Sequence, residues 1–348
     1  MSKTIISVER VNEVERHPDA DRLEIIQVLG FKTIAKKGQF KVGDAAIYFP
    51  PDMLIPENVA DELGVKTYLK HALYPGDSFK TQCRVSSARI RGIPSHGFPI
   101  GPVENDGTFG IDLTERYGGH KYEPPVRVGA GDTIAGNPFF HRYTNIENIQ
   151  RRNYFQDGEM VRITEKLHGT NCRLGLILED DDWVFAAGSH NLRRNKPSLY
   201  WEPMTDEVVD LLNSLCDGKR NIVVFGEIFG PGVQTMDYGQ PDKQFRVFDI
   251  SVEGVYADWE LVRMTCKGFG IPTVPLLYEG PYSKAVVDEY TDGPTVVASK
   301  DQIKCPFKGR EGIVITPLVE RVVRSNRVIA KSVSADYRDK ASWDEVGE

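Results

Sequence analysis

Lys166 is the residue whose type and surroundings most favour covalent chemistry in this sequence. It follows an alternating apolar run, Glu159–Thr164, that is typical of a strand, and Gly169 comes shortly after it, where the backbone can turn sharply and approach a ligand. A protonated lysine is a poor nucleophile, but desolvation or nearby cations lower its pKa and make the amine reactive. A surface lysine before a turn would show the same Lys-x-x-Gly pattern. Other residues must therefore decide between these two interpretations.

Four further residues provide, in chain order, the other side chains that a nucleotide-transfer site requires. Such a site needs a carboxylate for the ribose hydroxyls, an aromatic ring for the base, a carboxylate for a metal ion and a cation for phosphate. Each has a plainer explanation when taken alone, because strand-edge glutamates and core aromatic residues are common in any sheet. The four are Glu227, Phe248, Glu311 and Lys331.

The segments around these residues predict a mixed α+β fold. In the first half, short apolar runs such as Ala45–Phe49 are separated by Gly and Pro, which indicates a small β-barrel or sandwich. In the second half, strand-like runs flank one amphipathic helix at Asp206–Cys216. This is an antiparallel pattern rather than the regular β-α alternation of a doubly wound sheet. No G-x-x-x-x-G-K-[ST] phosphate loop occurs in the sequence.

A turn-rich stretch, Gly129–Pro138, is the best candidate for a linker between two domains. We therefore predict domains at residues 1–136 and 137–348, each long enough to bury its own core. A short helix is also expected within Asp52–Leu63, closed by Asp61–Leu63 before Gly64, and a short helical piece at Ile146–Arg151.

Composition limits the classes of protein that the chain can belong to. The net charge of −7 disfavours a protein that simply coats nucleic acid, although local basic patches such as Arg84, Arg89 and Arg91 occur. The five cysteines are scattered and form no C-x-x-C pair, which argues against a disulfide framework or a structural zinc site. No run is long and apolar enough to span a membrane, and the N-terminus does not read as a signal peptide. We expect an intracellular, cytoplasmic protein with no obligate protein partner.

Taken in order, these segments resemble the covalent nucleotidyltransferase superfamily, which comprises DNA ligases, RNA ligases and mRNA capping enzymes. Five of its signature blocks match between Glu165 and Lys331, about half of the chain. His168, in Lys-Leu-His-Gly-Thr-Asn, is similar to the RNA ligase version of the motif, whereas the other branches usually carry aspartate there. They also place an OB-fold after the transferase domain, and too few residues follow Lys331 for one.

The N-terminal half refines the resemblance. The segment His17–Leu23 resembles the tRNA-binding type of OB-fold. An N-terminal OB domain joined to this motif looks like the fifth family of ATP-dependent RNA ligases. The resemblance implies an α+β chain, with an OB-fold β-barrel followed by an antiparallel-sheet, ATP-grasp-like nucleotidyltransferase domain. It also implies joining of a 3′-OH to a 5′-phosphate at nicks in duplexes whose 3′-OH strand ends in RNA.

The resemblance assigns a role to each candidate residue. Lys166 would attack the α-phosphate of ATP and carry AMP, which would pass to the 5′-phosphate of the nick. Glu311 would bind Mg²⁺ or Mn²⁺. The residues that would contact the nucleotide are Glu165 through its backbone, Asn171, Arg193, Glu227 at the ribose, Phe248 on adenine and Lys331 at the α-phosphate. His190 and Arg194 are alternatives to Arg193, and Arg327 could share the role of Lys331, because Ile329 stands where the family often has a second lysine.

Other functions remain open from the sequence. A DNA ligase or a capping-type guanylyltransferase would use the same lysine chemistry, and labelling by ATP or by GTP would separate these enzymes. A non-catalytic RNA-binding protein built on the OB domain would have no use for the nucleophile and its carboxylates. His168 could also serve only to satisfy a turn.

Overall fold

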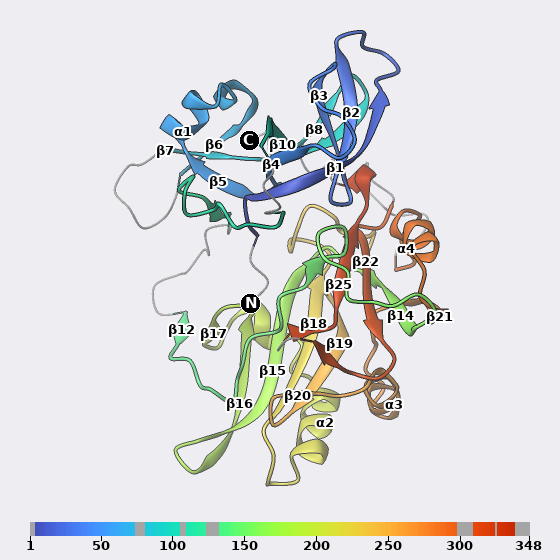
Figure 1. Cartoon of the computed structure of the whole chain (residues 1–348). Helices are drawn as coiled ribbons and strands as arrows, with labels where there is room; N and C mark the ends of the chain where they lie inside the picture. Colours follow the sequence, from blue (N-terminus) through green and yellow to red (C-terminus); the bar gives the residue numbers. More distant parts are fainter. Residues whose placement is uncertain are drawn as a thin grey trace. The chain divides into compact units, whose positions relative to one another are not determined.

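The computed structural model of the chain describes residues 4–73, 81–104, 109–122, 132–297, 309–323 and 326–337 (Figure 1). These residues divide into two compact units. The first holds the chain up to residue 122 together with Gln150–Arg152, and the second holds residues 132–149 and Asn153–Tyr337. Residues 129–131 of the predicted linker, and Cys305, lie outside the described residues, and the domain limits 1–136 and 137–348 stay a prediction.

The first unit consists mainly of two antiparallel sheets and one short helix, α1 (Glu57–Glu62). The five-stranded sheet has the order β10 (Phe98–Val103), β4 (Ala45–Phe49), β1 (Ser7–Arg16), β2 (Leu23–Val28), β3 (Phe31–Lys36). The four-stranded sheet has the order β11 (His120–Lys121), β5 (Met53–Pro56), β7 (Thr81–Arg84), β6 (Lys70–Leu73). A 3₁₀ turn at Lys66–Tyr68 and the hairpin β8 (Ser87–Ile90) and β9 (Ile93–His96) complete the unit.

Strand β4 lies in the middle of the apolar core of this unit. All five of its residues are buried, because it lies between β1 and β10 and packs apolar side chains on both faces. The continuous apolar run in the sequence is typical of such a strand. The prediction of a strand at Ala45–Phe49 is therefore confirmed.

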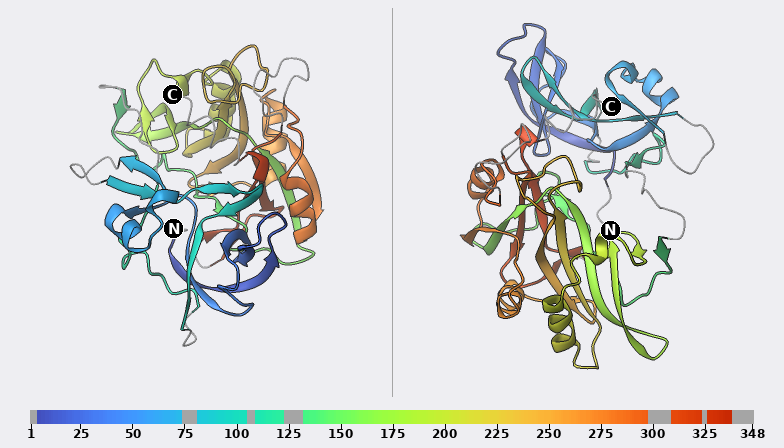
Figure 2. Two further views of the ribbon diagram at one scale, coloured as in Figure 1. Left: turned by 90° about the horizontal axis from the view of Figure 1, so that it is seen from above. Right: turned by 180° about the vertical axis from the view of Figure 1, so that it is seen from behind.

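The second unit contains two larger sheets. The seven-stranded sheet has the order β12 (Thr133–Ile134), β17 (Arg193–Arg194), β16 (Asp182–Ser189), β15 (Thr170–Glu179), β18 (Ile222–Phe229), β19 (Gln244–Val252), β20 (Val255–Tyr256). The five-stranded sheet has the order β13 (Glu147–Asn148), β25 (Ala330–Val333), β22 (Gly312–Pro317), β14 (Met160–Lys166), β21 (Leu276–Pro281). Strands β23 (Val322–Val323) and β24 (Asn326–Arg327) form a small ribbon. Figure 2 shows the long β15–β16 hairpin, in light green, from behind.

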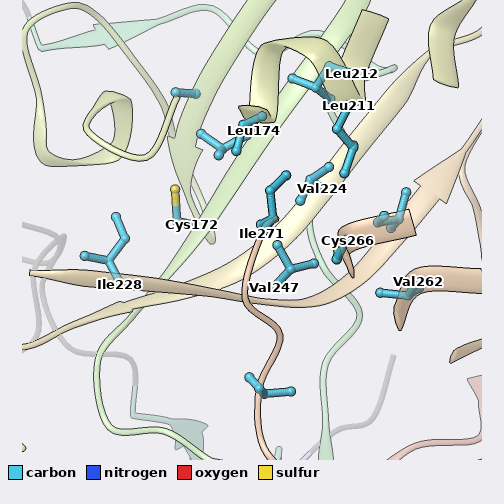
Figure 3. Close-up of a cluster of buried hydrophobic side chains, with 14 of the residues drawn as sticks. Cys172, Leu174, Leu211, Leu212, Val224, Ile228, Val247, Val262, Cys266 and Ile271 are labelled. Carbon is cyan, nitrogen blue, oxygen red and sulfur yellow. The ribbon is translucent and has the colours of Figure 1, made fainter. Parts of the chain in front are cut away.

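Helices cover the outer faces of these sheets. Helix α2 (Asp206–Cys216) packs against β15 and β18, and α3 (Trp259–Gly268) packs against β19. Figure 3 shows this core, in which Leu211 and Leu212 of α2 lie beside Leu174 and Val224 of the sheet. Helix α4 (Lys284–Thr291) covers β22 and β25, and a 3₁₀ turn lies at Leu199–Trp201. The predicted helix at Asp206–Cys216 is confirmed.

The two sheets of the second unit also share a core of their own. Phe225 of β18, Tyr143 and Val314 of β22 belong to one apolar cluster, so these faces of the two sheets pack toward each other. Residues two apart on a strand share a face, and directly opposed residues on neighbouring strands do so as well. By this alternation, the side chains of Lys166 on β14 and Glu227 on β18 lie on the faces through which the two sheets pack together.

One local prediction needs correction. Ile146–Arg151 is not helical: Glu147 and Asn148 form β13, which pairs in parallel with β25. Backbone pairing with a distant strand overrides the local helical pattern there. The short helix expected within Asp52–Leu63 is present as α1, which begins at Glu57 because Met53–Pro56 is a strand that pairs with β7. Within the described parts of the chain, no helix has the length and apolar character needed to cross a bilayer.

Candidate active site

Lys166 and Glu311 form an ion pair at the end of β14. Lys166 is the last residue of this strand and lies opposite Gly312, the first residue of β22. Its Nζ donates a hydrogen bond to Oε1 of Glu311 at 2.5 Å, and about a quarter of the lysine side chain (25%) remains exposed. A Cβ at Gly312 would lie 2.1 Å from the carbonyl oxygen of Ser332, and its φ is +154°. Glycine at this position therefore allows the chain to bring Glu311 beside the lysine.

Glu227 and Asn171 face each other on neighbouring strands beside this pair. Asn171 of β15 is directly opposite Glu227 of β18, so their side chains lie on the same face of the sheet. The backbone N–H of Gly169 donates to the carboxylate of Glu227. A Cβ at Gly169 would lie 2.1 Å from the carbonyl oxygen of Ile228, so the motif glycine is required for β15 to approach β18 this closely.

One amine and two carboxyl groups, Lys166, Glu311 and Glu227, influence one another's protonation in this cluster. Burial raises the pKa of Glu227 to about 8; the Lys166 ammonium opposes the shift, and the negative charge of Glu311 adds to it. Burial opposes the charged form of Lys166, but the carboxylates of Glu311 and Glu227 outweigh that effect and raise the pKa of the lysine. Without ligands the lysine is therefore an ammonium group, and it has to lose a proton before it can act as a nucleophile.

The same residues fit a hard divalent cation. Oδ1 of Asn171 is buried and has no hydrogen-bond partner among the described residues, although such atoms are normally paired. Together with the carboxylates of Glu227 and Glu311 it provides oxygen ligands, which Mg²⁺ and Mn²⁺ prefer. In the described part of the chain, no group of three or more His, Cys, Asp or Glu is arranged to hold a metal. A cation here would thus keep water or substrate oxygens among its ligands.

His168 lies beside Glu311 and connects it to residues that sequence patterns did not single out. Its Nδ1 is 3.8 Å from Oε2 of Glu311 and is hydrogen-bonded to the hydroxyl of Tyr337 at 2.8 Å. Its Nε2 is hydrogen-bonded to Thr235 at 3.2 Å, and its backbone N–H donates to the hydroxyl of Tyr238 at 2.6 Å. No local spacing signals these partners, because they lie far from His168 in the chain. The imidazole of His168 is therefore hydrogen-bonded to residues that lie outside its own turn.

Phe248 and Lys331 lie on strands that border the cluster. Phe248 is at a β-bulge of β19, where the pairing shifts beside Phe225, and bulges re-aim side chains in this way. Its ring meets the ring of Tyr143 edge-on, with 4.9 Å between centroids. Lys331 lies opposite Val314, which is itself opposite Thr164, so Lys331 is on the same face as Lys166, two strands away.

The remaining candidates have side chains that are held elsewhere. The guanidinium of Arg193 donates to both oxygens of Glu179, at 2.5 and 2.9 Å, so a contact with a nucleotide would require this ion pair to break. Arg194 is paired with Asp132 at 2.6 Å. The carboxylate of Glu165 accepts hydrogen bonds from the side chain of Thr295 and from the backbone of Val296, and its backbone N–H donates to the carbonyl oxygen of Pro275 at 2.9 Å.

Arg327, which was expected to replace the lysine that the family often has at the position of Ile329, is part of a separate buried network. It donates to Asp249 at 2.9 Å and to Glu320 at 2.5 Å, and its guanidinium lies 3.8 Å from the centre of the Tyr256 ring. These contacts occupy the guanidinium. Among the described residues, the structure thus brings together Lys166, Glu311, Glu227 and Asn171, with His168 beside them.

Comparisons with known proteins bear on the family and the fold of the chain. A family model for RNA ligases matches residues 159–333, and a model for an OB-fold domain matches residues 5–101. No curated protein sequence matches the chain. Among solved structures, the chain is similar to Naegleria gruberi RNA ligase with PPi, with a TM-score of 0.76, 23% identity, and 98% of this chain and 99% of that chain covered.

Two further structures of that ligase are similar to the chain. A mutant with ATP and Mn has a TM-score of 0.73 and 22% identity, with 98% of each chain covered. A mutant with AMP and Mn has a TM-score of 0.77 and 22% identity, with 97% of this chain and 99% of that chain covered. The predicted α+β fold with an N-terminal OB-fold domain is confirmed. Because the matching family model covers half of the sequence and contains every element that borders Lys166, the chain belongs to the RNA ligase family.

Proposed function

We propose that the chain is an ATP-dependent RNA ligase that works through a covalent lysyl-AMP intermediate on Lys166. The observation that carries the proposal is the pairing of Lys166 with Glu311 beside Glu227 and Asn171. Solved relatives that hold ATP and Mn, or AMP and Mn, support the choice of nucleotide and metal. A structural lysine would not need a second buried carboxylate whose pKa is raised.

In the first step, the neutral amine of Lys166 attacks the α-phosphorus of ATP. An N–P bond forms, the bond to the bridging oxygen breaks, pyrophosphate leaves and the amine loses a proton. A divalent cation, when bound, neutralises charge on the triphosphate and offsets the carboxylates that hold the lysine protonated. Glu227 accepts hydrogen bonds from the ribose, Phe248 stacks on adenine, and Glu311 holds the cation through water or directly.

Further contacts complete the nucleotide site. Asn171 contacts the nucleotide or water on the metal, Lys331 contacts the α-phosphate, and the backbone of Glu165 orients adenine. Arg193 contributes only if its ion pair with Glu179 opens. In the second and third steps AMP passes to the 5′-phosphate, and the 3′-OH then displaces it to form the phosphodiester bond.

The substrate that we propose is a nick in a duplex whose 3′-OH strand ends in RNA. The OB-fold domain supports nucleic acid as the partner, because such domains bind oligonucleotides on one face of the barrel. We also expect the protein to act in a reducing, cytoplasmic environment, which the free thiols of the four described cysteines support.

Labelling with radioactive nucleotide tests the central step. We expect the protein to become labelled by [α-³²P]ATP with Mg²⁺ or Mn²⁺, and label to be lost in Lys166→Ala. Label that survives in Lys166→Ala would remove the assignment of the nucleophile. Stronger labelling by GTP than by ATP would favour a capping-type enzyme instead.

Sealing assays test the substrate. Nicked duplexes that differ only in the terminal sugar of the 3′-OH strand, ribose or deoxyribose, should be sealed with ribose and poorly with deoxyribose. Equal sealing of both would contradict the RNA 3′-OH requirement while leaving the lysyl-AMP step intact. Exchanging the complementary strand between RNA and DNA then defines the duplex that is preferred.

A further inference from the structure

Tyr337 reaches the candidate active site from the segment that follows the last strand of the second unit. Its hydroxyl is hydrogen-bonded to Nδ1 of His168 at 2.8 Å, and the two rings meet with 5.4 Å between centroids. The tyrosine lies outside the residues that the RNA ligase family model matches, 159–333.

The segment that carries Tyr337 is attached to the site at a second point. The backbone N–H of Ser334 donates to the carbonyl oxygen of Glu311 at 2.9 Å, and the Ser334 hydroxyl accepts from the backbone N–H of Tyr337 at 3.3 Å. The ring of Tyr337 also packs against the large apolar core. These contacts give the tyrosine a defined position beside Glu311.

His168 is held at both ring nitrogens as a result. Tyr337 holds Nδ1 and Thr235 holds Nε2, while Nδ1 remains 3.8 Å from the second carboxylate oxygen of Glu311. Each hydroxyl can donate or accept, so both can serve either neutral tautomer of the imidazole. The first carboxylate oxygen of Glu311 holds Lys166. The ring of His168 therefore limits where this carboxylate can move.

We propose that Tyr337 is a positioning residue for transfer of AMP to Lys166. Its hydroxyl fixes the imidazole of His168, and the fixed imidazole keeps the Glu311 carboxylate in the place from which it orients the lysine. The proposal rests on the lysyl-AMP function proposed above. Small displacements of reacting groups reduce rates strongly, so loss of the hydroxyl should slow chemistry more than it weakens binding of ATP.

The test is Tyr337→Phe, which keeps the ring and removes the hydroxyl. We expect the rate of lysine adenylylation at saturating ATP to fall about tenfold, with KM for ATP changed less than about twofold. The matched control is Tyr278→Phe, which also removes a hydroxyl that donates one hydrogen bond, to the carbonyl oxygen of Pro281 at 2.9 Å, away from the site. That control should label at the rate of the unchanged protein.

A double-variant cycle separates positioning from a general loss of stability. If Tyr337 acts through His168, the variant Tyr337→Phe/His168→Ala should label no more slowly than His168→Ala alone. Effects of the two changes that multiply would overturn the proposal. So would full-rate labelling by Tyr337→Phe.

Histidine-ring NMR provides a readout that does not depend on turnover. The ring ¹⁵N resonances of His168 are identified by their absence in His168→Asn. In Tyr337→Phe we expect the Nδ1 resonance to move and the Nε2 resonance to change little, and neither should move in Tyr278→Phe. An unmoved Nδ1 resonance would overturn the proposal. Absence of any label on the unchanged protein would instead overturn the proposed function, so the two failures can be told apart.

Discussion

Two clusters of charged side chains in the second unit differ in how completely their charges are paired. In the first, Arg162 and Arg327 face Asp249 and Glu320, so two cations meet two carboxylates. In the second, the single ammonium of Lys166 meets Glu311 and Glu227. The first cluster also stacks its guanidinium groups on Trp259 and Tyr256, at 3.9 and 3.8 Å from the ring centres.

The difference indicates which cluster holds the sheets together and which one binds a ligand. Buried charges are tolerated when each is paired and hydrogen-bonded, and removing one partner is then costly. In the paired cluster Oδ1 of Asp249 accepts no hydrogen bond from the described residues, but it lies 3.6 Å from the guanidinium of Arg162. In the Lys166 cluster burial raises the pKa of Glu227, and Oδ1 of Asn171 has no hydrogen-bond partner among the described residues. Such unsatisfied groups lower stability unless a ligand completes them, and they are typical of functional sites.

The largest expected effect on stability comes from breaking the paired cluster. Arg327→Met leaves Asp249 and Glu320 buried without their main cation, so the free energy of unfolding should fall by about 3–5 kcal/mol. Denaturant titration measures this change. Arg263→Met is the matched control, because its ion pair with Glu260 is exposed, and it should leave the denaturation midpoint unchanged. Equal loss in both variants would contradict a special role for the buried network.

Glu227→Gln should separate function from stability in the unpaired cluster. We expect lysine adenylylation to fall more than about 100-fold, because the ribose loses its carboxyl partner. The variant should nevertheless be more stable than the unchanged protein near pH 8, by up to about 4 kcal/mol, since a buried carboxyl whose pKa is raised to about 8 is removed.

The pH dependence of that gain follows from the pKa of Glu227, which is raised to about 8. Below the unfolded value, near 4.5, both states of the unchanged protein hold the proton and the carboxyl has no effect. As pH rises from there to about 8, the unfolded state releases the proton while the folded state keeps it, so stability falls. The gain of Glu227→Gln should thus be absent at pH 4 and present at pH 8. A gain that does not depend on pH would contradict this origin.

Glu311→Gln should make Lys166 more reactive as a free amine. Its carboxylate is a main reason that the pKa of the lysine is raised, so its loss lowers that pKa and increases the neutral fraction at pH 9. We expect acylation of Lys166, followed by mass spectrometry, to speed up about three- to tenfold. The exposed Lys32 serves as an internal reference, with the same rate in both proteins. Slower acylation of Lys166 in the variant would contradict the assignment.

The smallest effect on stability is expected for Asn171→Ala. Its buried Oδ1 has no partner among the described residues, so the free energy of unfolding should change by less than about 1 kcal/mol, while adenylylation falls about tenfold. Asn221→Ala is the matched control, since that amide accepts from Leu178 at 2.8 Å and donates to Glu253 at 3.1 Å. It should cost about 1–3 kcal/mol without a specific effect on labelling. A large loss of stability in Asn171→Ala would mean that its oxygen is satisfied.

Much of the fold could be predicted from local patterns. The helix at Asp206–Cys216 and the strand at Ala45–Phe49 were expected with the bounds that the structure has, because apolar spacing reports directly which face is buried. Helices α3 and α4 were not predicted, since each is short and only part of one face is buried. The strand at Glu147–Asn148 could not be predicted either, because its only support is a partner far along the chain.

The sequence by itself determined the order of the chemical groups: a lysine before a glycine turn, then a glutamate within a strand, an aromatic strand, a second glutamate at a strand start and a final lysine. Each of these groups can be recognised from its immediate neighbours in the chain, whichever strands pair in the fold. Only the tertiary structure decided that Arg193 and Arg327 are engaged in ion pairs, that Asn171 lies opposite Glu227, and that Tyr337 reaches His168. The physical reason is that strand register and charge pairing join residues far apart in the chain, and short-range spacing carries no information about such partners.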